Sequence, residues 1–318
     1  MSSGARQTLQ YAIETTNGTT PSPFARTALP FTSTSLDQTA SREQSNTITT
    51  GRIAQQGNIS SVEIAGDIEA EFRYRVFDDF ISAVAFNNWV LGADDDDPDT
   101  LTFGGTVRKS FSILRGYEDV NVYETFAGVH VNTWALSIPE TGIINNTFGL
   151  MGKKRTPSTT APTGSVTPAT LNPTLSSVSV GNILIDGESQ VGIACISSID
   201  FNWDNTMQVQ RCLGAGLSIG NIIETAANGS GSFTMAWSTK AGQDYYERQF
   251  KNQTIGLEIT IYEDPDDLTS NQYTLSIPEV EITMALPSGG KDEILQATVE
   301  FNVVNQSPVL SRLAKPTP

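Results

Sequence analysis

Few side chains in this sequence belong to the types that carry out catalysis. His130 is the only histidine, so any Ser-His-Asp or Cys-His arrangement has one possible base. It lies in the strand-like run Val129–Asn132, where we expect a structural histidine with satisfied hydrogen bonds. A single histidine also excludes zinc sites built from several histidines. These observations argue against an enzyme.

The two cysteines, Cys195 and Cys212, form no CxxC pair and cannot build a disulfide framework. Cys195 is in phase with Ile193, Ile199 and Phe201, so we interpret it as a small buried hydrophobe. A disulfide between the two cysteines, or a metal site, is the less favoured alternative.

Two acidic runs, Asp94–Asp99 and Glu263–Asp267, invite a calcium interpretation. Neither has the EF-hand spacing with a closing Glu, so we favour solvated loops. No carboxylate pair is singled out for glycoside hydrolysis, and the glycines around Gly214 and Gly216 do not have the spacing of a dinucleotide fingerprint. We therefore expect no cofactor, no metal and no catalytic residues.

The composition narrows the class further. A net charge of −16 argues against tightly held nucleic acid, because phosphate binding needs clustered Lys and Arg. Hydrophobic residues make up 38% of the chain, which is enough for a folded protein. No apolar run approaches the roughly 18 residues of a membrane helix, and Met1–Gln10 lacks a signal-peptide pattern. We expect no membrane insertion and folding in a cytoplasm.

The elements that these residues occupy are mainly strands. Ser60–Tyr74 alternates apolar and polar residues, which predicts a half-buried strand with Gly66 as a bend or bulge. Helical spacing follows from Phe77 to Ala85, and alternation returns beyond it. The pattern recurs in the second half, where a helix of about 10 residues follows Trp237.

The two halves follow the same plan. Five positions recur 165 residues later (231 − 66 = 165), and the runs that end at Asp119 and Asp264 resemble each other at an offset of 145 (262 − 117 = 145). The paired positions are Gly66, Phe72, Asp79, Phe80 and Asn87 with Gly231, Trp237, Asp244, Tyr245 and Asn252. The acidic loop after Asn87, long in the first copy only, accounts for the difference.

We therefore expect a mainly β fold of two tandem β-sandwich or curled-sheet units, each with one flanking α-helix. The expected organisation begins with residues 1–40, either an N-terminal arm that orders only against a neighbour or a disordered tail. A first unit (41–152), a Thr/Pro-rich linker or loop (153–176), a second unit (177–310) and a C-terminal tail (311–318) follow.

Several motifs in order resemble the tail tube (major tail) protein family of long, non-contractile-tailed bacteriophages. They are Ser41–Glu43, Thr50–Arg52, Val62–Phe72, Phe77–Val84 up to Trp89, Lys109–Ile113 and Phe126–Asn132, with a looser match at Ile199–Asn205. Within the chain, Leu136-Ser-Ile-Pro-Glu140 recurs as Leu275-Ser-Ile-Pro-Glu279, which favours a duplicated tail-tube fold.

The resemblance implies a structural virion protein whose sheet edges join into rings, and whose rings stack into the tube through which DNA is ejected. It implies no catalytic residues. Six units usually form a ring, so three two-unit chains would give a trimer with pseudo-sixfold symmetry, and a true hexamer is the alternative. The implied partners are other copies, tape measure and terminator proteins, and passing genomic DNA. The implied location is the virion tail, assembled in the host bacterial cytoplasm.

Two groups of residues are candidates for roles in such a tube. Asp67, Glu69 and Glu71 share the polar face of the long strand and would repel phosphate from a lumen, although an outward solvated face explains them equally well. The basic run Lys153, Lys154 and Arg155 is a candidate inter-ring contact, with a solvated run as the alternative. Alternative functions are another tail ring component (terminator or baseplate hub) or a carbohydrate-binding β-sandwich that uses its tryptophans.

Overall fold

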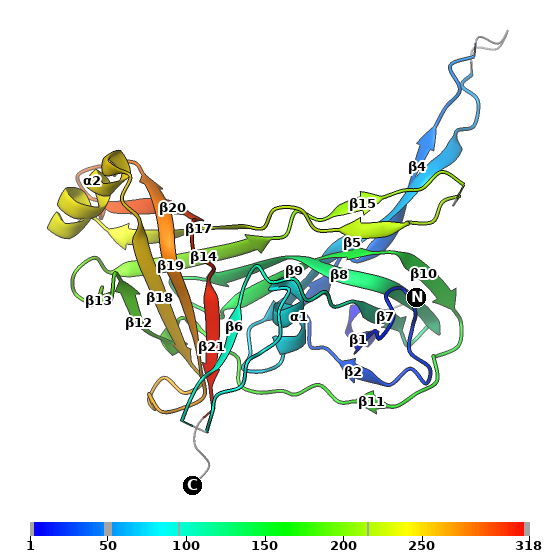
Figure 1. Ribbon diagram of the computed structural model, residues 1–318, viewed down its shortest axis with the longest axis horizontal. Coiled ribbons are helices and arrows are strands. Elements are labelled where there is room, and N and C mark those ends of the chain that lie inside the picture. The colour runs from blue at the N-terminus through cyan, green and yellow to red at the C-terminus, as the bar shows by residue number, and fades with distance from the viewer. Residues whose placement is uncertain (1–2, 48–52, 95, 215, 315–318) are drawn as a thin grey trace.

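A computed structural model describes residues 3–47, 53–94, 96–214 and 216–314 (Figure 1). The motif at Thr50–Arg52, Asp95 of the acidic run and Ala215 between the two glycines lie outside the described residues. The fold is mainly β, as the sequence predicts, and nineteen strands join into one network of pairings. Strands β15 (Gln208–Gln210) and β16 (Asn221–Ile223) form a separate hairpin.

In the first half, six strands pair in the order β4-β5-β9-β8-β7-β1, and every pair is antiparallel. Short strand β3 (Ser33–Thr34) continues β4 along β5, and α1 lies between β5 and β7 in the chain. The bounds are β1 Gln7–Ile13, β4 Asp37–Glu43, β5 Asn58–Glu71, α1 Asp78–Val84, β7 Phe111–Tyr117, β8 Val122–Ile138 and β9 Asn145–Gly152.

In the second half, six strands pair in the order β14-β17-β20-β19-β18-β12, again antiparallel throughout. The helical segment between β17 and β18 consists of three short pieces: η3, α2 and η4. The bounds are β12 Val180–Ile185, β14 Ile196–Asp204, β17 Asn228–Ala236, η3 Ala241–Tyr245, α2 Tyr246–Arg248, η4 Gln249–Lys251, β18 Ile255–Tyr262, β19 Gln272–Met284 and β20 Gln296–Val303.

The two halves share one sheet, because the C-terminal part of β8 pairs with β14 from Thr133↔Asp204 to Ile138↔Ile199. A second link runs through β21 (Val309–Leu313), which pairs with β19 on one side and with β6 (Asp99–Thr102) on the other. The remaining short elements are η1 Gly4–Arg6, β2 Arg26–Ala28, β10 Lys154–Ser158, β11 Val166–Thr167, η2 Ser177–Ser179 and β13 Glu188–Ser189.

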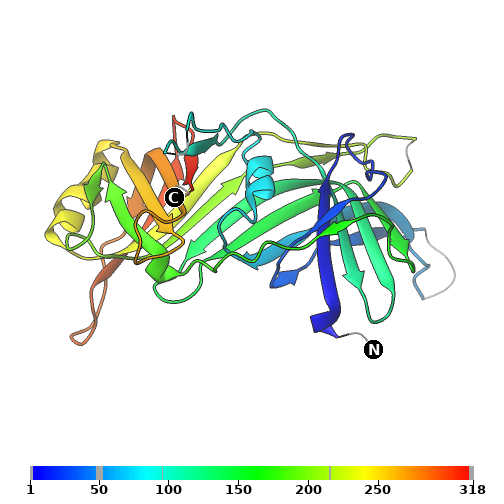
Figure 2. The same cartoon turned by 90° about the horizontal axis from the view of Figure 1, so that it is seen from below.

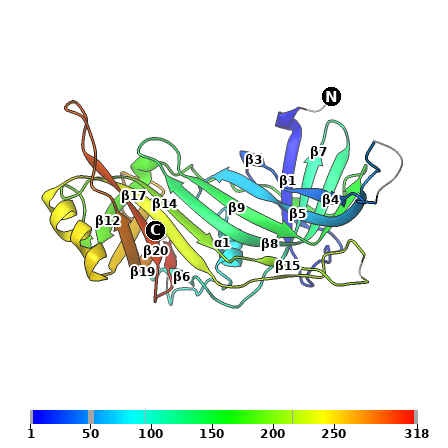
Figure 3. The same cartoon turned by 90° about the horizontal axis from the view of Figure 1, so that it is seen from above.

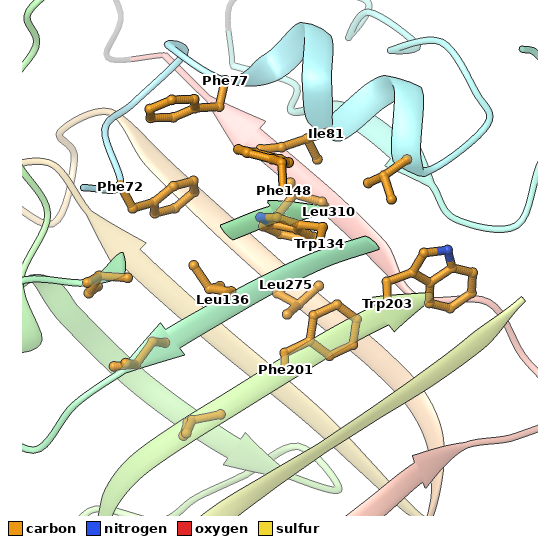
Figure 4. Close-up of a cluster of buried hydrophobic side chains, with 14 of the residues drawn as sticks. Phe72, Phe77, Ile81, Trp134, Leu136, Phe148, Phe201, Trp203, Leu275 and Leu310 are labelled. Atoms are coloured by element: carbon orange, nitrogen blue, oxygen red, sulfur yellow. The ribbon is translucent and has the colours of Figure 1, made fainter. Parts of the chain in front are cut away.

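One continuous hydrophobic core runs beneath both halves of the sheet. Helix α1 covers the first half and inserts Phe80 and Ile81, both fully buried, against Phe148 of β9. Figure 4 shows Trp134, Phe201 and Trp203 continuing this layer across the β8–β14 junction. Burial of such large side chains makes the junction part of the core rather than a hinge between separate domains.

The predicted long strand is confirmed as β5. Ile64, Ile68 and Ala70 are buried and the residues between them face outward, in the expected alternation. Gly66 has a φ of +148°, and a Cβ at this position would lie 2.5 Å from the carbonyl oxygen of Ser35. The crossing strand therefore approaches too closely for any other residue.

The N-terminal segment differs from the expected arm that orders only against a neighbour. Strand β1 pairs along its whole length with β7, from Gln7↔Tyr117 to Ile13↔Phe111. Leu9 is 2% exposed and belongs to the core. The segment is rich in Ser, Thr and Gly, and its few apolar residues are spread over several short strands. The sequence therefore shows no alternating pattern there.

The Thr/Pro-rich stretch is also more ordered than a linker, although most of it is exposed as expected. Strand β10 pairs with β8, and β11 pairs in parallel with β2. Leu175 is 1% exposed. At the other end, Ser311, Arg312 and Leu313, expected in the C-terminal tail, belong to β21.

Two long hairpins extend from the sheet. The hairpin that contains β15 and β16 lies over the first half, where Met207 and Ile222 pack on Phe86 (Figures 1 and 3). The hairpin formed by β4 and β5 projects away from the body of the chain (Figures 1 and 2). The first of these hairpins lies between β14 and β17 in the chain, and the second is made of β4 and β5 themselves.

Candidate functional site: a polar sheet face with two open edges

The face of the sheet opposite the core is polar over both halves. Seven adjacent strands form it, and none of them contains Lys or Arg: β5, β9, β8, β14, β17, β20 and β19. Its acidic residues are Glu63, Asp67, Glu69, Glu71, Asp200, Asp204, Glu281 and Glu300. Alternation within each strand places these residues on one face, because their neighbours are buried.

The three acidic residues predicted for a lumen lie together on this face. Asp67 and Glu69 are exposed and Glu71 is half-buried. Glu69 Oε2 accepts a hydrogen bond from Ser33 Oγ at 2.7 Å, and Glu71 pairs with Arg73 at 3.0 Å. Arg73 lies just beyond the end of β5, so it neutralises only this edge of the acidic surface.

The second half supplies acid to the same face from different strands. Ser232 of β17, at the position that corresponds to Asp67, is neutral, but it lies directly between Asp200 of β14 and Glu300 of β20. Asp200 and Glu300 were not predicted from the sequence, because they lie on the two strands that flank β17 and not on β17 itself. The alternation of Ile199, Phe201 and Trp203 with polar neighbours was the signal that could have found Asp200.

The polar face is hollowed where the two halves meet. A shallow depression of about 420 Å³ is lined by residues of β8, β14, β17, β20 and β19, among them Ser137, Asp200 and Glu300. A hollow on the face opposite the core makes this surface concave. A concave acidic surface can enclose a space, but it offers no arrangement of groups for a reaction.

A largely buried ionic cluster links α1 and β6 of the first half to β19 and β21 of the second. Asp78 at the start of α1 accepts hydrogen bonds from Tyr273 and Arg312, and Arg312 Nε also donates to Asp99 Oδ2 at 2.9 Å. Burial raises the pKa of Asp78, while the hydrogen bonds from Tyr273 and Arg312 oppose that shift. Burial also raises the pKa of Tyr273 well above its usual value. The cluster is closed by its own partners and is structural.

His130 is confirmed as a satisfied structural histidine. It is 2% exposed, its Nδ1 lies 3.0 Å from the carbonyl oxygen of Lys109, and its Nε2 lies 3.1 Å from Asn17 Nδ2. Burial lowers its pKa from 6.5 to about 4. A neutral ring with its proton on Nδ1 satisfies both contacts, so His130 has no free nitrogen to offer a substrate.

The interpretation of Cys195 as a buried residue is wrong. Both cysteines are exposed, and they are free thiols. Cys195 has a φ of +32° in the turn before β14, and a register shift between Ile196 and Ser198 breaks the phase on which the prediction relied. Within the described residues, no three or more His, Cys, Asp or Glu side chains gather to hold a metal ion.

The tryptophans are engaged in packing. Trp134 and Trp203 are buried, while Trp89 and Trp237 are half-buried against the core. The guanidinium of Arg312 lies 4.2 Å from the Trp89 ring centroid. These four tryptophans therefore do not form an exposed row of aromatic rings on which a sugar could stack.

The basic run emerges from the edge of the first half. Arg155 Nη2 donates to Glu124 Oε1 at 2.7 Å, Lys153 packs against Gly128, and Lys154 is exposed. One of the three cations is thus already paired within the chain. Lys154 is exposed, whereas Lys153 and Arg155 are half-buried.

Comparison with known families decides the identity. The sequence matches the family described as phage tail tube protein over residues 4–303, from before β1 to the end of β20. The chain belongs to the phage tail tube protein family. No curated protein matches it. A tail tube protein is a structural part of the phage virion tail. Among the described residues no helix is long and apolar enough to cross a bilayer.

The two outer edges of the tail tube protein's shared sheet are formed by β4 and by the C-terminal part of β19. Among the described residues, β4 pairs with no strand other than β5, and the part of β19 from Glu281 to Met284 pairs with no strand other than β20. Sheet edges without a neighbouring strand are the places through which strands of different molecules associate.

Proposed function

We propose that this tail tube protein polymerises through its sheet edges into rings, and that the rings stack into the tube through which DNA leaves the particle. The observation that carries the proposal is the intrachain pairing of β8 with β14. It joins an edge of the first unit, at β8, to an edge of the second unit, at β14. The remaining edges are their counterparts, because β19 corresponds to β8 and β4 corresponds to β14. Joining these edges around a ring would leave no edge unpaired.

The proposal rests on a tandem duplication of one tail-tube unit. Its support is that each strand of the first order, β4-β5-β9-β8-β7-β1, has a partner at the same place in the second, β14-β17-β20-β19-β18-β12. Because β12 corresponds to β1, we extend the first unit from 41–152 back to β1 and keep 177–310 as the second.

Two glycines support the same correspondence in detail. A Cβ on Gly66 would lie 2.5 Å from the Ser35 carbonyl oxygen, and a Cβ on Gly231 would lie 2.2 Å from the Asp200 carbonyl oxygen. Both the glycines and their contacts are separated by the same offset (231 − 66 = 165; 200 − 35 = 165). In both units, then, the chain at or next to the edge strand (β4 or β14) approaches a glycine of the neighbouring strand (β5 or β17) closely.

The correspondence gives a register for the contact between chains. Within the chain, Ala135 of β8 lies opposite Asn202 of β14. Their counterparts are Ala285, just after β19, and Asp37 of β4 (202 − 37 = 165). Ala285 and Asp37 are both exposed. We propose that they face each other across the junction between adjacent chains.

Three chains would supply six units to a ring with pseudo-sixfold symmetry. The support is that one junction of the six-unit pattern is already made inside each chain, so that three further junctions close the ring. A hexamer in which one unit of each chain lines the tube would leave the β8–β14 junction without a role. We favour the trimer for this reason.

The concave acidic face would line the tube, since α1 and the core occupy the other side of the sheet. Asp67, Glu69 and Glu71 from one unit and Asp200 and Glu300 from the other would give every sixth of the ring a negative surface. Like charge repels the phosphate backbone, so DNA would pass without binding.

Stacking of rings would use segments at the margins of the sheet. Lys153, Lys154 and Arg155 remain candidates for this contact, and Lys154 is the exposed member. If Lys154 docks on an acidic surface of the next ring, Lys154→Glu should shorten or abolish tubes while rings still form. Tubes of normal length from this variant would exclude the contact.

We further propose that tape measure and terminator proteins meet the tube during its assembly in the host cytoplasm. A terminator or baseplate hub made of a single ring is the second candidate function, because such a ring would use the same edges. The carbohydrate-binding alternative is not favoured, because the four tryptophans pack on the core.

Negative-stain images of the concentrated protein would test the proposal. We expect hollow filaments whose end views show three chains in a ring. Single rings that never stack would favour the terminator or hub, and a protein that stays monomeric in the presence of preformed tail tips would contradict polymerisation.

A further inference from the structure

The open edge of β19 is occupied by a side chain of its own unit. The backbone N–H of Met284 donates to Gln249 Oε1 at 3.3 Å, and Gln249 Nε2 donates to the Met284 carbonyl oxygen at 3.2 Å. The N–H and C=O of one strand residue point to the same side, so these groups point away from β20. A primary amide that meets both reproduces the two hydrogen bonds that a neighbouring strand would make.

The corresponding place in the first unit is filled by a strand. Trp134 of β8 lies opposite Phe148 of β9, and Met284 of β19 lies opposite Val299 of β20. Since Phe148 and Val299 hold the same place in the two units, Trp134 is the counterpart of Met284. Trp134 lies opposite Trp203 of β14. The hydrogen bond from Asn205 N to Asn132 O, 3.0 Å, shows that alternate residues of β8 direct their backbone groups toward β14.

The side chain that fills the place in the second unit has no equivalent in the first. Val84, the counterpart of Gln249 (249 − 84 = 165), has no side-chain polar group. Its carbonyl oxygen instead accepts a hydrogen bond of 2.8 Å from Asn205 Nδ2, at the end of the incoming strand β14. The first unit thus shows the arrangement with a strand seated, and the second shows it with the strand replaced by Gln249.

Exposed apolar side chains surround the occupied edge. Leu286 is 59% exposed, whereas Leu136 in the filled junction is 3% exposed. Strand pairing makes these two residues counterparts (286 − 136 = 150, the offset of Met284 from Trp134), so the sequence repeat that aligns Leu136 with Leu275 is out of register with the strands. Phe250, next to Gln249, is 66% exposed. A strand seated at this edge would cover Leu286, which gives the exchange a hydrophobic driving force that the two hydrogen bonds alone lack.

We propose that the Gln249 amide is a latch, which holds the β19 edge closed in the free subunit and is displaced when β4 of a second copy pairs there. Displacement of the latch breaks the two Gln249–Met284 hydrogen bonds, and the incoming strand makes two in their place. The latch should therefore slow edge pairing with little effect on the stability of the assembled ring. It would keep subunits from associating before a tail tip supplies an ordered row of β4 strands. The inference rests on the proposed ring assembly.

Hydrogen exchange tests the latch in the free subunit, independently of assembly. Gln249→Ala and the similarly sized Gln249→Met should raise the exchange rate of the Met284 amide about tenfold, the effect expected for loss of one such hydrogen bond. Gln253→Ala, at an exposed glutamine four residues on, is the matched control and should leave that rate unchanged. An unchanged Met284 rate in both Gln249 variants would overturn the latch.

Assembly kinetics test its displacement. Both Gln249 variants should form tubes with a lag several-fold shorter than that of the wild type and of Gln253→Ala, and Met284 should be protected in every tube. An equal or longer lag, or a tube structure that retains the Gln249–Met284 contact, would overturn the proposal. If the wild-type chain itself forms no rings with tail tips present, the proposed function fails, and the exchange rates still show separately whether Gln249 covers the edge.

Discussion

Trp134 and Trp203 lie directly opposite each other across the strands that join the two halves of the chain. Phe103 packs against both, with ring centroids 5.8 Å from Trp134 and 5.2 Å from Trp203. All three side chains are at most 4% exposed. Three buried aromatic side chains at the β8–β14 pairing make this junction a fixed part of the fold. A fixed geometry is what the junction needs if the same contact is repeated between chains.

Removal of the central ring should therefore destabilise the whole chain. Phe103→Ala should lower the free energy of unfolding by about 3–5 kcal/mol, the usual cost of a large buried aromatic side chain. Urea denaturation followed by tryptophan fluorescence would measure it. Thr102→Ala, at the exposed neighbour, is the control. A loss below about 1 kcal/mol would show that the two halves are not held together at this junction.

The buried ionic cluster should respond very differently to loss of each of its arginines. Arg312→Met would leave the Asp78 carboxylate buried without its cation, which typically costs about 3–5 kcal/mol. Arg75, whose side chain is 45% exposed, pairs with Asp99 at 3.3 Å and lies over the Tyr74 ring, so Arg75→Met should cost at most about 1 kcal/mol. Denaturation of both variants would measure this difference.

A double variant isolates the cause. Asp78→Asn should recover part of the stability lost in Arg312→Met, because a neutral amide needs no cation. Additive losses in the double variant would contradict a charge-based role for Arg312 and would point to its packing on Trp89.

Stability should fall in mildly acidic solution because of His130. Its folded pKa is about 4 against an ordinary 6.5, so the unfolded chain binds the proton first and stability is lost as the pH falls from 6.5 toward 4. The full contribution is about 3 kcal/mol at roughly 1.4 kcal/mol per pH unit. His130→Gln keeps hydrogen-bonding groups but does not titrate. The difference in stability between variant and wild type should therefore change over this window, and a constant difference would exclude the effect.

Charge on the concave face should govern DNA passage. Neutralising the face with Asp67→Asn, Glu69→Gln and Glu71→Gln should slow ejection, most strongly at low ionic strength, because phosphate repulsion is weakened. A matched control neutralises exposed acids elsewhere: Glu140, Glu247 and Asp292. Equal ejection rates for the two triple variants would refute a role for these three residues in the lumen.

Local patterns in the sequence predicted the elements with a strong period and missed those without one. Strands β5, β18 and β20 alternate over eight residues or more, and all are observed. Strand β1 lies in a segment of small polar residues, where burial of Leu9 and Tyr11 depends on pairing with β7, about 100 residues away. Such distant partners leave no local signal.

The functional surface was predicted in part for the same reason. The acidic face of β5 follows from alternation within one strand. The face as a whole, with Asp200 and Glu300 on either side of Ser232, depends on which strands become neighbours. The pairing of Trp134 with Trp203, and the contact between Gln249 and Met284, likewise arise only when the sheet has formed.

A disulfide across the proposed junction tests the central claim most directly. Ala285 and Asp37 are assigned to a pair without mutual hydrogen bonds, whose Cα atoms would be about 4.5 Å apart, within the range of a disulfide. The double variant Ala285→Cys, Asp37→Cys would be made with Cys195→Ser and Cys212→Ser, since both native thiols are exposed. Ala285→Cys with Ser33→Cys, four residues out of register on the same strand edge, is the control.

On oxidation of assembled protein, we expect the Ala285–Asp37 pair to give covalent trimers that migrate as closed rings on a denaturing gel. The control pair should give little cross-linking. Equal cross-linking of the two pairs, or monomers alone from assembled tubes, would contradict the account in which the junction inside the chain is repeated between chains.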